Sequence, residues 1–179
     1  KTRAYALGLA GLYLNIKGRE AEGIVEPGQE AQRLKDELIE KLSGLRDEER
    51  SALGIRELFD TAKLYQGPYL REAPDFIIGF NHGYRTSWDC ATGMASGPVF
   101  EDNVKAWSGD HIVDPRIVPG VFFCSEKIDS QDPGIVDIAP TVLRLFGLEP
   151  PPNMDGRPLF VARPGEARPA PAAPESAAA

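Results

Sequence analysis

Apolar positions along the chain form short runs and one helical stripe. The stretch Ala4–Ile16 is rich in Tyr, Leu and Ile and is interrupted by Gly8 and Gly11, which predicts two short strands around a bend. Between residues 31 and 45 the leucines are three or four positions apart, so they share one face of a helix that begins after Gly28. The first quarter of the chain is therefore predicted to be a strand pair followed by an amphipathic helix.

The middle of the chain contains one ambiguous segment, two apolar runs and a long loop. Residues Ile55–Leu64 fit either a short helix or an edge strand. Asp75–Phe80 is a short apolar run after a proline, which is typical of a buried strand in a parallel sheet. A similar run, Val118–Cys124, predicts another strand. Asn81–Trp107 has little periodicity and many Gly, Ser and Asn residues, which indicates a functional loop.

The C-terminal region contains a second predicted helix and a tail. Residues 138–146 place several apolar side chains on one helical face, with Asp137 as an N-cap and Gly147 as a stop signal. Residues 163–179 are mainly Ala, Pro, Glu and Arg with almost nothing to bury, which predicts a disordered tail. The predicted organisation is one domain over residues 1–162 followed by this tail.

The order of these elements predicts an α/β fold, in which helices cover the faces of a sheet. Ligand sites in such sheets lie beyond the carboxyl ends of the strands. Because Asp75–Phe80 runs directly into the loop Asn81–Trp107, we expect the chemistry at this edge of the sheet.

Composition limits the class of partner. The 179 residues are 42% hydrophobic and 26% charged, which is ordinary for a globular protein. The net charge is −7 with acidic residues spread along the chain, which argues against a nucleic-acid polymer, since phosphate backbones bind clustered Lys and Arg. No apolar run approaches the roughly 20 residues of a membrane span. The two cysteines say little about the compartment, and the sequence predicts neither a localisation nor an oligomeric state.

Candidate chemistry concentrates in the segment Trp107–Val121, which contains one of the two histidines. Gly109 allows a tight turn, and His111 follows Asp110 directly. A lone histidine is more often structural or simply exposed than a metal ligand. Asp110 fits two roles equally well, since it can orient the imidazole of His111 or act as a turn residue beside a glycine.

Several motifs in a fixed order resemble the C-terminal end of the alkaline phosphatase superfamily, in particular its type I phosphodiesterase/nucleotide pyrophosphatase branch. The motifs are K-T-R-A-Y-A-L-G-L-A-G-L-Y-L-N, P-D-F-I-I-G-F, G-Y-R-T-S-W, G-D-H, V-P-G-V-F-F, D-I-A-P-T-V-L and N-M-D-G-R-P-L. The resemblance covers about residues 1–160. It implies an alkaline-phosphatase-like sheet sandwiched by helices and incomplete at its N-terminus. We therefore expect the chain to be the C-terminal part of a longer protein.

The resemblance implies a phosphoric ester hydrolase with two divalent metal ions, expected to be zinc, and a Ser or Thr nucleophile. The histidine of the G-x-H turn binds one metal ion in this family, which makes His111 the expected metal ligand. The nucleophile and the other ligands match no position of this chain. The chain alone is accordingly expected to contain no catalytic residue and to be inactive.

The expected substrate is a small-molecule phosphate ester. Arg85 is a candidate contact to a phosphate oxygen and Trp88 a candidate stacking surface for a leaving group, although both fit packing of the loop on the sheet better. Two alternatives remain at this stage. The chain is either a non-catalytic folding or interaction module, or part of a phosphomutase or phosphotransferase of the same superfamily.

Overall fold

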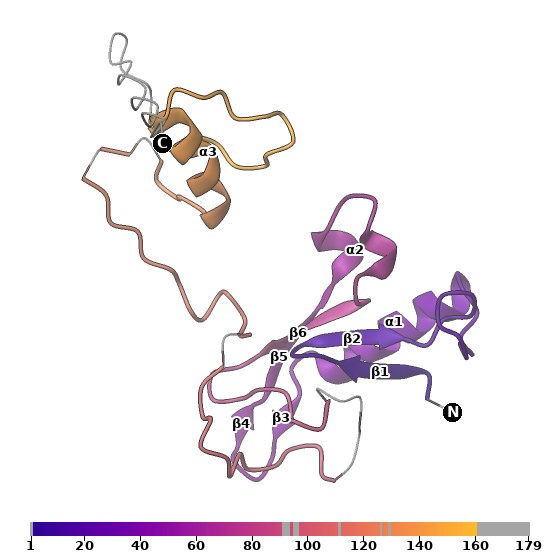
Figure 1. Cartoon of the computed structure of the whole chain (residues 1–179). Helices are drawn as coiled ribbons and strands as arrows, with labels where there is room; N and C mark the ends of the chain where they lie inside the picture. The colour runs from indigo at the N-terminus through magenta and orange to yellow at the C-terminus, as the bar shows by residue number, and fades with distance from the viewer. Residues whose placement is uncertain are drawn as a thin grey trace, which may run out of the picture. The chain divides into compact units, whose positions relative to one another are not determined.

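The computed structural model describes residues 2–90, 94, 97–110, 112–125, 127–128 and 130–160. The chain divides between Gly120 and Val121 into two compact units, termed here the N-terminal unit and the C-terminal unit (Figure 1). The predicted boundary at residues 162 and 163 and the tail beyond it lie outside the described residues. No helix in the described part of the chain is both long and apolar enough to cross a bilayer.

A four-stranded antiparallel sheet forms the centre of the N-terminal unit (Figure 1). The fold is mixed α and β, as the order of predicted elements indicates. The strands lie in the order β1 (Ala4–Leu7), β2 (Gly11–Leu14), β6 (Phe76–Phe80) and β5 (Ile55–Asp60).

The predicted strand pair at the start of the chain is confirmed as the hairpin β1–β2. Ala4 lies opposite Leu14, and Tyr5 lies opposite Tyr13. The two tyrosine rings stack with their centroids 5.4 Å apart. Gly8 has a φ of 73° in the connection, a conformation that glycine adopts without a steric penalty.

The prediction of a parallel strand at Asp75–Phe80 is wrong. β6 pairs antiparallel with both β2 and β5. Alternate residues from Phe76 onward are buried in the core, while Gly79 on the opposite face is covered by Phe59 and Asp114. The continuous apolar run therefore reflects burial of both faces, which in this sheet does not come from parallel neighbours.

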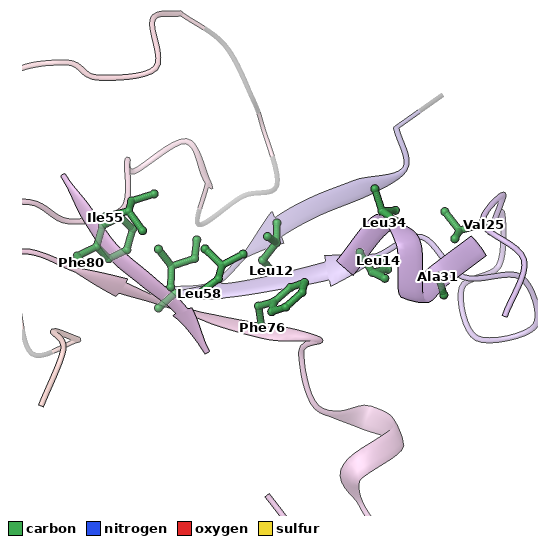
Figure 2. Close-up of a cluster of buried hydrophobic side chains, with 11 residues drawn as sticks. Leu12, Leu14, Val25, Ala31, Leu34, Ile55, Leu58, Phe76 and Phe80 are labelled. Atoms are coloured by element: carbon green, nitrogen blue, oxygen red, sulfur yellow. The ribbon is translucent and has the colours of Figure 1, made fainter. Parts of the chain in front are cut away.

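The predicted helix is confirmed as α1 (Gln29–Leu42), which packs with the core of the sheet. Ala31 and Leu34 are buried, and the later members of the leucine stripe are half-buried against the same core. Figure 2 shows the buried cluster that the helix and the strands share, with the fully buried Leu14 and Phe76 among its members.

The ambiguous segment Ile55–Leu64 contains both alternatives, strand β5 and then one turn of helix, α2 (Thr61–Leu64). The carboxylate of Asp60 accepts a hydrogen bond from the Ala62 amide at 3.1 Å and so caps α2. Three short elements complete the N-terminal unit: β3 (Arg46–Asp47) and β4 (Ala52–Leu53), which form a two-stranded ribbon, and η1 (Leu70–Glu72).

The C-terminal unit contains η3 (Ile135–Asp137) and the predicted helix, α3 (Ile138–Leu145). Gly147, with a φ of 72°, follows the last turn as predicted. Asp137 occupies the N-cap position, but its side chain does not bond to α3. Its carboxylate instead accepts hydrogen bonds from the Gly134 amide at 2.9 Å and the Arg157 amide at 2.8 Å.

α3 buries Pro140 and Thr141 rather than its apolar stripe. The Thr141 hydroxyl donates to the Asp137 carbonyl at 2.5 Å and accepts from the Leu159 amide at 2.9 Å. The stripe residues Val142, Leu145 and Phe146 are exposed. Hydrogen bonds to buried polar atoms therefore hold residues 157–159 against α3.

The predicted strand at Val118–Cys124 does not form. All residues of this segment are described, and none lies in a strand. Phe123 is 90% exposed. Pro119 has no N–H to donate to a neighbouring strand, and an apolar run without a pairing partner gains too little from extension to form one.

Candidate functional site

The loop that follows β6 is fixed to the β3–β4 ribbon close to its start. The Asn81 side-chain amide donates to the Leu53 carbonyl at 2.9 Å, and the Tyr84 hydroxyl donates to Asp47 Oδ2 at 2.9 Å. Arg50 contacts the same carboxylate, with Nη1 3.4 Å from Oδ2. Burial raises the pKa of the Asp47 carboxyl, but the hydrogen bonds from Tyr84 and Arg50 outweigh it and hold that pKa below its usual value.

Aromatic packing fixes the returning part of the same loop. The rings of Tyr84 and Phe100 meet edge to face with centroids 5.6 Å apart. Phe100 also lies against Gly54, where an added Cβ would be 2.5 Å from its ring. The Ser87 hydroxyl donates to Glu101 Oε1 at 2.8 Å. The predicted functional loop is therefore held to the ribbon on both of its sides.

Arg85, Trp88 and Asp110, three residues singled out in the sequence, meet in this loop. Arg85 Nε lies 3.0 Å from Asp110 Oδ2, and Arg85 Nη1 donates to the Gly109 carbonyl at 3.3 Å. The guanidinium carbon of Arg85 is 4.5 Å from the centroid of the Trp88 ring. Trp88 is 39% exposed, so it packs on Arg85 while part of its surface faces solvent.

Lys105 is a member of this cluster that the sequence analysis missed. Its Nζ lies 5.1 Å from the centroid of the Trp88 ring. Asn103 shapes the turn around it, because its Oδ1 accepts from the Lys105 amide at 3.2 Å and its Nδ2 donates to the Trp107 carbonyl at 2.5 Å. In the described part of the chain no carboxylate lies within ion-pair distance of Lys105. Nothing in the sequence pattern marks this residue, since its contact with Trp88 depends on the path of the loop.

His111 lies outside the described residues, so the structure does not test it as a metal ligand. Its neighbours are placed. Asp110 Oδ1 accepts a hydrogen bond from the Ile112 amide at 3.1 Å, while Oδ2 pairs with Arg85. Gly109 does not adopt a positive φ. The Asp110 carboxylate thus makes the side-chain-to-backbone bond that was expected of a turn residue.

Metal binding depends on the donor set. The described residues contain no group of three or more His, Cys, Asp or Glu side chains that could hold a metal ion. Asp110, the carboxylate nearest in sequence to His111, is already within ion-pair distance of Arg85 and hydrogen-bonded to the backbone. The described residues therefore do not make a metal site by themselves.

Comparisons of the chain with protein-family models, with curated proteins and with solved structures found no match.

Proposed function

We propose that this chain is the C-terminal part of a metal-dependent phosphohydrolase with an alkaline-phosphatase-like fold, acting on small-molecule phosphate esters. In this proposal His111 binds one of two divalent metal ions, expected to be zinc. The nucleophile and the other ligands come from residues outside this sequence. When bound, such a pair of ions stabilises the attacking and leaving oxygens of a phosphoryl transfer.

The observation that supports the proposal is the contact of Asp110 with Arg85, which in turn packs on Trp88. The sequence marks these residues in two separate segments, and the fold brings them together directly beside position 111. An aspartate so placed accepts a hydrogen bond from the amide of Ile112, the residue that follows His111.

The charges of the cluster suit a phosphate ester. The described contacts of Arg85 use Nε and Nη1, which leaves Nη2 for a phosphate oxygen. The Asp110 carboxylate offsets much of the positive charge of Arg85, whereas Lys105 retains its own. Two cations beside a partly exposed indole provide positive charge for an anionic group and apolar surface for an aromatic leaving group.

The test is the substitution His111→Ala in the longer protein that this proposal requires. Hydrolysis of p-nitrophenyl phosphate and of bis-p-nitrophenyl phosphate is measured together with bound metal. We expect activity to fall by more than about 100-fold and metal content to fall with it, because loss of a direct ligand exceeds the effect of losing a supporting residue.

His82 provides the matched control, since it is the other histidine of the chain and is exposed. His82→Ala is expected to retain activity and metal content. Wild-type turnover and metal content in His111→Ala would remove His111 from the site. Absence of phosphoesterase activity in the longer wild-type protein would reject the proposed function as a whole and leave the interaction module as the better description.

A further inference from the structure

Asp114, three residues after His111, has the most completely buried carboxylate among the ion pairs of the described residues. Its side chain is 0% exposed. Oδ1 accepts from the Arg116 amide at 3.0 Å, and Oδ2 lies 2.6 Å from Arg116 Nη2. Arg56 of β5 approaches from the sheet, with Nε 3.3 Å from Oδ2. Two guanidinium groups therefore surround one buried carboxylate.

Arg116 connects the turn at residues 114–117 to strand β5. Its Nη1 donates to Glu57 Oε2 at 2.8 Å, and its guanidinium carbon lies 5.0 Å from the centroid of the Phe59 ring. Glu57 and Phe59 alternate along β5 with the buried Leu58, so they lie on the face of the sheet opposite the core. The turn at residues 114–117 therefore packs on the face of the sheet opposite the core.

Gly79 of β6 allows the turn to pack closely on the sheet, because it has no side chain. A Cβ at Gly79 would lie 3.3 Å from Asp114 Oδ2, 2.7 Å from the Phe59 ring and 3.1 Å from the Glu57 carbonyl oxygen. A side chain at this position would clash with the Phe59 ring and would crowd both the Glu57 carbonyl oxygen and the Asp114 carboxylate. On the other side of position 111, Asp110 is held by Arg85.

We infer that Asp114 is a positioning residue, which together with Arg56 and Arg116 anchors the segment after His111 to the sheet. The two carboxylates, Asp110 and Asp114, fix the chain on both sides of the histidine. The anchoring stands on the contacts alone, whereas its consequence for catalysis rests on the proposed function.

Stability alone gives little reason for this arrangement. A buried ion pair is often matched in stability by apolar residues of similar volume, because desolvation of the charges offsets their attraction. The charged contacts do set an orientation, since Asp114 lies against Arg56 of β5 and holds the Arg116 guanidinium, which in turn donates to Glu57 of β5. Since Asp114 lies three positions after His111, a change at Asp114 is expected to reach position 111 through the residues between them.

The test replaces Asp114 by Asn in the full chain and follows the two histidines by NMR. Asn offers one acceptor in place of two and carries no charge. We expect the imidazole resonances of His111 to shift and broaden, and those of the exposed His82 to stay unchanged. Glu49→Gln is the matched control, because it neutralises an exposed carboxylate of the same unit that takes no part in the anchor. It should leave both histidines as in the wild type.

Arg116→Gln gives a second route if Asp114→Asn does not fold, since the Arg116 side chain is half exposed and its loss leaves no buried void. It should change the His111 resonances in the same direction. In the longer protein, Asp114→Asn should lower kcat by about 10–100-fold with a smaller change in KM.

Unchanged His111 resonances in a folded Asp114→Asn or Arg116→Gln variant would overturn the inference, whatever the activity of the longer protein. Equal changes at His111 and His82 would overturn it as well, because they indicate general loosening. A selective change at His111 without any phosphoesterase activity in the longer wild-type protein would keep the anchor and reject only the proposed function.

Discussion

Buried aspartates join distant parts of this chain at the residue scale. Asp47 connects the β3–β4 ribbon to Tyr84, and Asp75 accepts from the Leu14 amide at 2.7 Å while pairing with Arg19. Asp137 binds two backbone amides in the C-terminal unit in the same way. A carboxylate accepts several hydrogen bonds at once, so one buried side chain can hold two segments that share few apolar contacts.

Asp137 should make the C-terminal unit sensitive to acid. The hydrogen bonds from the Arg157 and Gly134 amides hold the pKa of the Asp137 carboxyl below its usual value. The unfolded chain then binds more protons, so this stabilisation is complete above the unfolded pKa of about 3.9 and is lost as pH falls through the folded pKa. We expect the dispersed amide resonances of Thr141 and Leu159 to disappear as the pH falls below about 4.

Asp137→Asn tests this prediction, with Asp132→Asn as the control on an exposed carboxylate. The new side-chain amide at position 137 places an N–H group where a backbone N–H already points, so the C-terminal unit should be less stable at neutral pH and less dependent on acid. An unchanged acid transition in this variant, with Asp132→Asn behaving like the wild type, would show that another group controls the unit.

At the scale of elements, local sequence pattern determines where a helix or a hairpin forms, whereas the direction of a strand depends on the strands with which it pairs. The leucine spacing of residues 31–45 predicted α1, and the glycine-broken apolar run predicted the β1–β2 hairpin, because both elements depend on neighbours close in sequence. Strand direction in β6 was predicted wrongly, since an apolar run records burial and not the direction of its partners. Val118–Cys124 was predicted as a strand for the same reason, although pairing requires a partner edge.

Gly79→Ala should test the packing of the loop on β6. The added Cβ would meet the Phe59 ring at 2.7 Å and the Glu57 carbonyl oxygen at 3.1 Å, and the carbonyl oxygen belongs to a paired strand. We expect the free energy of unfolding to fall by about 1–3 kcal/mol, as is typical of overpacking. The measurement is urea unfolding followed by tryptophan fluorescence, which reports the N-terminal unit because Trp88 and Trp107 both lie in it.

Gly109→Ala is the matched control, because a Cβ at Gly109 meets nothing within 4 Å and its φ is not positive. This change in the G-D-H motif should alter the free energy of unfolding by less than about 0.5 kcal/mol. Equal free energies of unfolding for Gly79→Ala and Gly109→Ala would contradict the prediction. They would mean that Asp114 and Phe59 do not pack on Gly79 as closely as the structure shows.

At the scale of the whole molecule, the sequence marked part of the candidate site and missed part of it. Arg85, Trp88 and Asp110 were named from their residue types and their place in a loop beside a histidine. Asp114 and Lys105 were missed because their roles come from tertiary contacts, that of Asp114 with Arg56 of β5 and that of Lys105 with the Trp88 ring. Position 111 itself lies outside the described residues, so its role as a metal ligand stays a prediction.

Residues 1–179 taken alone should bind zinc only weakly. A catalytic zinc ion normally takes three protein ligands, and a structural one takes four. The described residues contain no group of three suitable donors, and Asp110 is already engaged with Arg85. His111 would thus supply one imidazole, which cannot offset the loss of the hydration shell of the ion. We expect zinc to bind more weakly than about 1 µM, which corresponds to less than about 8 kcal/mol of binding free energy.

Calorimetric titration of the purified chain with zinc, together with a p-nitrophenyl phosphoester assay, measures this directly. The double variant Cys90→Ser, Cys124→Ser removes thiolates that could bind zinc independently of the proposed site, and His111→Ala removes the proposed ligand. Weak binding without turnover agrees with a donor set that is completed elsewhere. The prediction would be contradicted by submicromolar one-to-one zinc binding that is retained in the double serine variant and lost in His111→Ala. This chain would then contain a complete zinc site beside Asp110 and Arg85.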